Sequence, residues 1–248
     1  MRFIIAPAKK MQVDTDTFTC KYDIAFPDKT RILMEWIKSL SYEEQKKLWA
    51  CNDKIALQNS QRFEDMDLTK NLTPAILAYD GIQYVYMAPA VFEYGHFDYV
   101  QEHVRILSGF YGVLKPMDGV VPYRLEMGSK VNVAGHNNLY DFWGDDLYNE
   151  VIDESRIVIN LASKEYSKCI EKYLKKDDTY ITCVFGELEG EKVVQKGVYA
   201  KMARGEMVRF VAEVGAEIPE KLKEFDWSGY QLDEKRSSET EYIFIKAK

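Results

Sequence analysis

The sequence predicts a mixed α/β (α+β) fold, in which helices surround one mixed sheet that carries a local basic cleft. The predicted strands and helices follow one another in a mixed order, which is typical of helices packed outside a sheet. Of the 248 residues, 46% are hydrophobic and 13% are aromatic, which is enough apolar surface for a substantial core. We see no internal repeat and no low-complexity linker, so we interpret residues 1–248 as a single domain.

The first half of the chain is predicted to be mainly helical after an initial strand. Arg2 to Ala6 is an apolar run that predicts a buried strand, and apolar residues recur at helical spacing between Asp28 and Ser39. Ser41-Tyr-Glu-Glu44 fits a capping box, and Pro74 suits a first helical turn. In order, we expect a strand at 2–6, helices at 28–39, 41–49 and 53–62, a short helix from 74 that Gly81 ends, an extended segment at 84–86, and a helix through Val100, Val104 and Leu107 that Gly109 ends.

The second half is predicted to alternate between helices and buried strands. Ile157 to Leu161 is a short apolar run, and Glu189-Gly190 is a hairpin turn that leads into Val193 and Val194. In order, we expect a helix at 139–153, a strand at 157–161, a helix at 164–175, a strand at 180–185, the hairpin, a long helix at 199–214 and a closing strand at 242–245.

Charge and apolar patterning exclude several classes of protein. A net charge of −7 argues against nucleic-acid binding by the whole surface, although it leaves room for a local basic cleft. The longest apolar run is too short to span a membrane, and the apolar stretch at the N-terminus is too short for a signal peptide. The four cysteines form no CxxC motif and predict free thiols in a reducing compartment. We therefore expect a cytoplasmic protein.

Metal and cofactor motifs are missing from the sequence. Three histidines are present, with no HxxxH and no CxxC spacing. Neither a GxxxxGK[ST] phosphate loop nor a GxGxxG dinucleotide motif occurs. We expect no metal site and no cofactor.

The segment from Ile106 to Gly128 is the most distinctive part of the chain. It contains four glycines and two prolines among its 23 residues, which neither a plain helix nor a plain strand would tolerate. Such a run predicts a shaped loop, and shaped loops carry function. Its candidate binding residues are Gly109, Gly112, Lys115, Tyr123 and Arg124, and Glu126 is a candidate acid or base or else the ion-pair partner of Arg124. The part LSGFYGVL is also weakly similar to a helix–hairpin–helix, whose glycines let backbone amides reach a DNA phosphate.

Four further segments supply candidate site residues. Lys9 and Lys10 follow the first strand and suit a phosphate or a carboxylate, and Asp145 follows Trp143 as a candidate catalytic residue or a helix cap. The other candidates are Asn160 and Ser163 at a strand-to-helix junction, where Ser163 is either part of an anion site or a plain N-cap, and Lys201, Arg204 and Arg209 on the long helix. Gly205 inside that helix costs about 1 kcal/mol relative to alanine and indicates close packing there.

Together these segments resemble the YaaA family of bacterial peroxide-stress-response proteins. The resemblance covers the whole chain, and the blocks PYRLEMG and FWGD in this order are its most specific features. The matching segments are APAK at 6–9, LSGFYGVLKPMD at 107–118, PYRLEMG at 122–128, LYDFWGD at 139–145, INLAS at 159–163, YAKMARG at 199–205, Gly229-Tyr230, and Ser237-Ser238. The chain departs from the family at Ala6 and Lys10, where the family often has Ser and Thr, and at Lys115, where it often has Arg.

The resemblance implies a cytosolic protein that protects cells from hydrogen peroxide. It implies a link to limiting free intracellular iron and to DNA binding through a positively charged cleft with a helix–hairpin–helix-like element. No established reaction comes with the family, so whether the chain is an enzyme stays open.

Two function classes fit these residues. In the first, the chain binds duplex DNA without turnover, and its lysines and arginines hold phosphates in one cleft. In the second, it is an enzyme that acts on a nucleobase or nucleotide as a small-molecule ligand, with Glu126 or Asp145 as acid or base and Tyr123 or Trp143 as a stacking surface. A binder needs an open groove, whereas an enzyme needs a closed pocket. Direct iron sequestration would need a cluster of ligands, and the spacing offers none. For a single site, Lys9, Arg124, Lys201 and Arg204 must converge.

Overall fold

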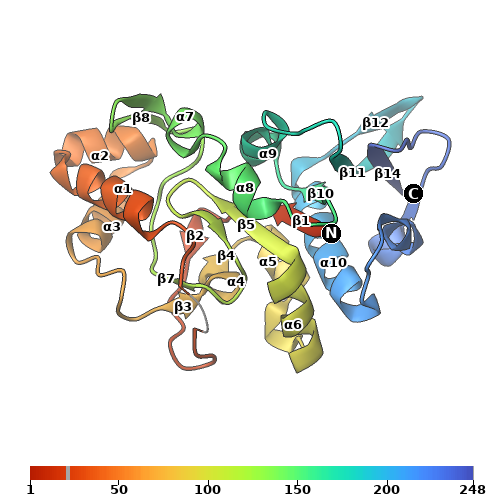
Figure 1. Cartoon of the computed structure of the whole chain (residues 1–248), viewed down its shortest axis with the longest axis horizontal. Helices are drawn as coiled ribbons and strands as arrows, with labels where there is room; N and C mark the ends of the chain where they lie inside the picture. The colour runs from red at the N-terminus through yellow and green to blue at the C-terminus, as the bar shows by residue number, and fades with distance from the viewer. Residues whose placement is uncertain (21–22, 248) are drawn as a thin grey trace.

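The computed structural model describes residues 1–20 and 23–247, and they contain an eight-stranded mixed sheet with helices on both sides (Figure 1). This confirms the predicted fold class. The strand order is β13-β14-β11-β10-β1-β5-β6, with β12 paired to β11. The strands are β1 (Arg2–Ile5), β5 (Val104–Ser108), β6 (Gly112–Leu114), β10 (Ile157–Leu161), β11 (Thr179–Glu189), β12 (Lys192–Val194), β13 (Tyr230–Leu232) and β14 (Glu241–Lys246).

The middle of the sheet is parallel, and its edges are antiparallel. β14, β11, β10, β1 and β5 pair in parallel, whereas β6, β12 and β13 pair antiparallel with their neighbours. After β1 the chain first builds β5 on one side of it and later returns to build β10 on the other. The sheet therefore changes direction of growth at β1, and ligands of open α/β sheets bind beyond the carboxyl ends of the strands at such a point.

The helices form two layers and a separate cluster. In Figure 1, α5, α6 and α10 lie on one side of the sheet, α8 and α9 lie on the other, and α1, α2 and α3 pack together at one end. The helices are α1 (Pro27–Ser39), α2 (Tyr42–Trp49), α3 (Asp53–Glu64), α4 (Ala75–Ala78), α5 (Ile82–Met87), α6 (Tyr94–His103), α7 (Leu139–Trp143), α8 (Asp146–Val151), α9 (Lys164–Glu171) and α10 (Gly197–Val214), with 3-10 turns η1 (Pro89–Val91), η2 (Pro219–Glu224) and η3 (Trp227–Gly229). Three short strand pairs complete the fold: β2 (Lys10–Met11) with β4 (Tyr79–Asp80), β3 (Thr73–Pro74) with β7 (Gly119–Val120), and β8 (Lys130–Val133) with β9 (His136–Asn138).

Local sequence signals explain many element ends. Ser41 caps α2 through the predicted capping box, in which its side chain accepts from the Glu44 backbone and the Glu44 carboxylate accepts in return. Pro27 occupies the first turn of α1. The predicted strand at 157–161 matches β10, and the predicted hairpin at Glu189-Gly190 joins β11 to β12.

Three expectations about the elements were wrong. Residues 84–86 are not extended but lie in α5, where burial of Tyr84 and Met87 reflects packing against α10. The helix expected through Leu107 ends at His103, because 104–108 form the strand β5, which is buried on both faces and therefore shows no alternation of buried and exposed residues. The helix expected at 139–153 is broken between α7 and α8 by Gly144, whose φ is +61°.

The glycine-rich segment at 107–114 is a β-hairpin, so the helix–hairpin–helix interpretation of it was wrong. β5 and β6 pair antiparallel around it. Gly112 has φ +77°, and a Cβ there would lie 2.9 Å from the Trp143 ring. The Trp143 side chain is buried at 1% exposure, and its indole donates to the Gly109 carbonyl at 3.1 Å. Trp143 is therefore a core residue and not a stacking surface for a base.

Candidate functional site

The candidate site is a pocket of about 390 Å³ at the carboxyl ends of β1 and β10. It lies where the sheet changes direction of growth. Residues after β1, the turn into α5, the segment after Pro122, the start of α9 and the middle of α10 form its walls. Its charged residues are the cations Lys9, Lys10, Arg124, Lys201 and Arg204 and the carboxylates Asp80, Glu126 and Glu165. Five cations against three carboxylates leave the pocket positive in a chain of net charge −7.

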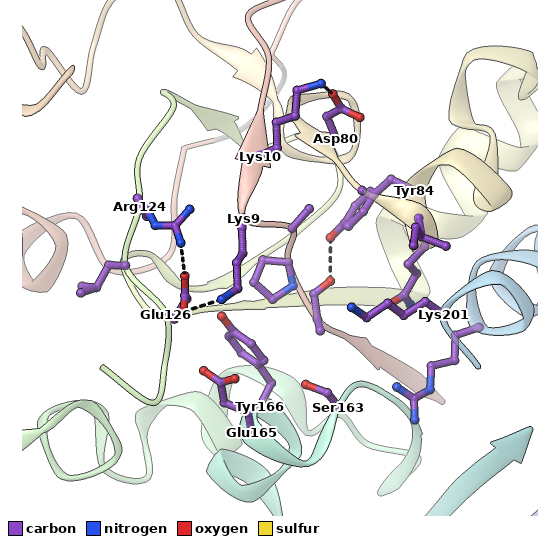
Figure 2. Close-up of a pocket in the computed structure, with 18 of the residues that line it drawn as sticks. Lys9, Lys10, Asp80, Tyr84, Arg124, Glu126, Ser163, Glu165, Tyr166 and Lys201 are labelled. Carbon is purple, nitrogen blue, oxygen red and sulfur yellow. Dashed lines mark hydrogen bonds and ion pairs between the residues drawn. The ribbon is translucent and has the colours of Figure 1, made fainter. Parts of the chain in front are cut away.

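One wall of the pocket is an ion-paired group formed by Lys9, Arg124 and Glu126. Glu126 accepts from Lys9 Nζ at 2.8 Å and lies 3.2 Å from Arg124 Nη2 (Figure 2). The Arg124 side chain is 13% exposed, whereas Lys9 is 65% exposed. Glu126 therefore neutralises part of the positive charge on this wall. Of the two roles considered for Glu126, the structure shows the ion pair with Arg124.

Glycines let the segments of this wall approach each other. A Cβ on Gly109 would lie 2.5 Å from the Leu125 carbonyl oxygen, so Gly109 allows the strand end to lie against the segment that carries Arg124. A Cβ on Gly81 would lie 2.7 Å from that of Ala8, so Gly81 allows the segment after β1 to reach the turn into α5.

Lys10 is paired at the rim of the pocket. The β2–β4 pairing places Lys10 opposite Asp80, and the two side chains form an ion pair (Figure 2). The Lys10 side chain is 78% exposed. Exposed ion pairs are screened by solvent, so this contact contributes little to stability.

The opposite wall carries Lys201 and Arg204 of α10. Lys201 is exposed and extends from α10 toward the middle of the pocket (Figure 2). Arg204 lines the same pocket but, unlike Lys201, it is partly buried. Desolvation lowers the pKa of Arg204, and its Nε has no hydrogen-bond partner within the described chain. Neither side chain forms an ion pair with the described residues, so the charge of this wall is not neutralised.

Ser163 lies at the N-terminal end of α9 and faces the pocket (Figure 2). Ser163 is the N-cap residue, but its side chain makes no capping hydrogen bond, so the plain N-cap alternative is not what the structure shows. The helix end adds a partial positive charge to the same side of the pocket.

A chain of buried hydroxyls supports the pocket floor. The Ser108 hydroxyl accepts from the backbone amides of Phe110 and Tyr111, which occupies both of its lone pairs. It therefore donates to Tyr123 Oη at 2.6 Å, and Tyr123 then donates to Tyr79 at 2.9 Å. Burial raises the pKa of Tyr123 to about 12, so its phenol stays protonated at neutral pH.

The pocket thus brings together eight of the candidate residues, and the other six lie elsewhere. The eight are Lys9, Lys10, Tyr123, Arg124, Glu126, Ser163, Lys201 and Arg204. The geometric expectation that Lys9, Arg124, Lys201 and Arg204 share one concavity is confirmed.

Gly109 and Gly112 pack inside the fold as described above, and four other candidates also lie outside the pocket lining. The Lys115 backbone amide donates to buried Asp118, and the amide oxygen of buried Asn160 accepts from the Ala162 backbone. Arg209 pairs with Glu213 and lies over the Trp227 ring, while exposed Asp145 accepts weakly from Asn149.

Sequence reasoning did not include several residues that line the pocket. Asp80 comes from the turn before α5, and Tyr84 comes from α5 itself. Tyr84 donates to the Ala6 carbonyl at 3.0 Å, which holds the end of β1 in place. The Asp80-Gly81 dipeptide was the available signal, because a glycine after an acidic residue marks a turn where chains approach.

The described residues contain neither a cluster of metal ligands nor a helix that could span a membrane. In 1–20 and 23–247, no group of three or more His, Cys, Asp or Glu side chains has an arrangement that could hold a metal ion. Over the same ranges, the helices are too short or too polar to cross a bilayer.

Comparison with known proteins identifies the family. Residues 1–236 match the family model described as "Peroxide stress protein YaaA". The chain is 60% identical over 244 residues to a UPF0246 protein of Agathobacter rectalis, covering 98% of each chain. It is 53% identical over 246 residues to a UPF0246 protein of Lachnoclostridium phytofermentans, covering 99% of this chain and 96% of that protein. A match over nearly the whole length, on the segments that form the pocket, shows that this chain belongs to the peroxide stress protein YaaA family.

Proposed function

We propose that this peroxide-stress protein binds DNA through the cation-lined pocket and so protects DNA against iron-driven oxidative damage. One observation carries the proposal. Five cationic side chains from three separate segments line one pocket in an otherwise acidic chain. Lysines and arginines that neutralise phosphates supply most of the affinity of proteins for DNA. The link with iron rests on the family resemblance.

The cations divide by depth into rim and interior. Lys9, Lys10 and Lys201 are exposed and can meet phosphates of a duplex at the surface. Arg124 and Arg204 are partly buried and lie deeper in the pocket. The acidic remainder of the surface repels DNA, so binding is expected to be weak at physiological salt.

A salt titration tests the proposal. Duplex DNA is titrated at several salt concentrations against the protein, the Lys201→Ala/Arg204→Ala variant and a Lys10→Ala control. Log affinity should fall linearly with log salt, by about 0.9 per phosphate contact, because neutralised phosphates release condensed counterions. The double variant should flatten the slope by roughly one to two units, and the control by at most about one. Affinity that does not depend on salt, or an unchanged slope in the double variant, would refute DNA binding at this pocket.

A second candidate is an enzyme that acts on a nucleobase or nucleotide in the same pocket. The observation in its favour is size, because about 390 Å³ lies within the usual range of small-molecule sites, about 300–1,000 Å³. Glu126 would be its carboxylate, fixed by Lys9 and Arg124. Turnover of nucleotides by the protein but not by a Glu126→Gln variant would favour this candidate.

A further inference from the structure

The cations of the pocket differ in whether a carboxylate already neutralises them. Lys9 and Arg124 share Glu126, and Lys10 pairs with Asp80. Lys201 and Arg204 have no such partner among residues 1–20 and 23–247. Lys9, Arg124 and Glu126 together keep one positive charge, whereas Lys201 and Arg204 keep two, so the larger unneutralised charge lies on the wall of α10. Ser163 and Glu165, at the start of α9, line the same pocket.

The position of Arg204 is costly without a ligand. Its Nε is buried and makes no hydrogen bond within the described residues. A buried donor without an acceptor destabilises the folded protein, and more so when the group is charged. A bound anion would offset the cost of burying this charge without a carboxylate partner, and the fork of the guanidinium fits two oxygens of a phosphate at once.

We propose that Lys201, Arg204 and Ser163 form a subsite for a terminal phosphate monoester of a nucleotide. This inference rests on the proposed function and names the chemical group that enters the pocket. A monoester carries about −1.5 to −2 charges at pH 7, which matches two unneutralised cations better than the single charge of a backbone diester. The nucleotide is either free or the 5′ end of a DNA strand, and both present the same phosphate.

The other wall then meets the nucleoside. The carboxylate of Glu126 lies between Lys9 and Arg124, so this wall offers both an acceptor and donors. Such a mixed surface attracts a second phosphate less than the wall of Lys201 and Arg204 does, and it can hydrogen-bond sugar hydroxyls or base edges. The pocket volume of about 390 Å³ suits a ligand of this kind.

Calorimetric titration with defined probes tests the inference. Thymidine 5′-monophosphate should bind and thymidine should bind at least about tenfold more weakly, because a charge-assisted phosphate contact contributes about 1.5–3 kcal/mol. A single strand with a 5′-phosphate should bind more tightly than the same strand with a 5′-hydroxyl if strand ends are a source of the ligand. Equal affinity for thymidine 5′-monophosphate and thymidine would overturn the subsite.

Substitutions of single cations test whether the phosphate binds on the wall of Lys201 and Arg204. Arg204→Ala should weaken binding of thymidine 5′-monophosphate by about tenfold or more. Lys70→Ala removes the same charge from an exposed cation that pairs with Asp67 outside the pocket lining, and it should leave this affinity nearly unchanged. Since Arg204 is partly buried and its variant can fail to fold, Lys201→Glu on the exposed position serves as the second variant and should also weaken binding. A Lys201→Glu variant with unchanged affinity, or a Lys70→Ala loss as large as that of Lys201→Glu, would overturn the assignment.

Two outcomes distinguish a failure of this inference from a failure of the proposed function. Salt-dependent binding of a 5′-hydroxyl duplex without binding of thymidine 5′-monophosphate would keep DNA binding and refute the subsite. Binding of thymidine 5′-monophosphate that depends on Arg204, without binding of any DNA, would keep the subsite and refute DNA binding.

Discussion

At the scale of single residues, burial decides what each charged group does. Arg204 and Lys10 are both cations of the same pocket, yet one is partly buried and unpaired and the other is exposed and paired. The sequence could place both near the site from their segments. It could not predict which one carries free charge, because pairing depends on the β2–β4 register that brings Asp80 beside Lys10.

Asp118 gives a pH-dependent prediction at this scale. Burial raises the pKa of Asp118 to about 6, although the Lys115 backbone amide and the Lys115 and Arg105 charges act against the rise. Between pH 4 and 6 the folded protein therefore binds more protons than the unfolded chain, and stability falls as pH rises through this window. Asp118→Asn cannot titrate, so its stability relative to the natural protein should increase from pH 4 to 7 by up to about 3 kcal/mol.

Urea unfolding at a series of pH values checks this expectation. The comparison is between the two free energies of unfolding at each pH, which cancels the contribution of all other groups. A difference that stays constant between pH 4 and 7 would mean that Asp118 titrates alike in the folded and unfolded states.

At the scale of elements, the contact between α5 and α10 positions the free cations. A Cβ on Gly205 would lie 2.1 Å from the Gln83 carbonyl oxygen and 2.9 Å from the Met87 amide, and both are backbone atoms that cannot turn away. The close approach that Gly205 indicated in the sequence is thus confirmed. Lys201 and Arg204 lie within one turn of this contact.

Gly205→Ala should therefore destabilise the protein. Alanine is more favourable than glycine in a helix by about 1 kcal/mol. Overpacking costs about 1–3 kcal/mol, and crowding of backbone atoms at this distance costs more, so the crowding outweighs the helix preference. The substitution should also weaken nucleotide binding by moving Arg204 away from Ser163. Gly197→Ala is the matched control, because it lies at the start of the same helix with no atom within 4 Å of its Cβ. Thermal unfolding of the two variants checks the expectation, and equal melting temperatures would contradict it.

The elements also show where sequence reasoning reached its limit. Local signals predict where some elements begin or turn. Pro27 marks the start of α1, the capping box marks the start of α2, and the glycine turn marks the β11–β12 hairpin. The strand β5 was mistaken for the end of a helix, because a strand covered on both faces has no alternation. The same buried hairpin made the glycines 109 and 112 resemble a binding loop, whereas they serve packing.

At the scale of the whole molecule, the pocket exists because distant segments meet at one edge of the sheet. Parallel pairing of β1 with β10 brings the residues after Ile5 next to those after Leu161, and α10 closes the pocket from the other side (Figure 2). The sequence predicted that four of its cations would converge, on the argument that they lie in its most distinctive segments. It could not predict the pocket's size, which depends on the packing of all these elements.

Survival under hydrogen peroxide tests most directly whether this pocket performs the protein's stress function. A bacterial strain that lacks its own member of the family would express the natural protein, the Lys201→Ala/Arg204→Ala variant or a Lys70→Ala control outside the pocket, with immunoblots to match protein levels. The account predicts that the natural protein and the control restore survival and that the double variant does not, because it loses the unneutralised cations that hold the phosphate. Full rescue by the double variant at equal protein level would contradict the claim that the pocket carries the function.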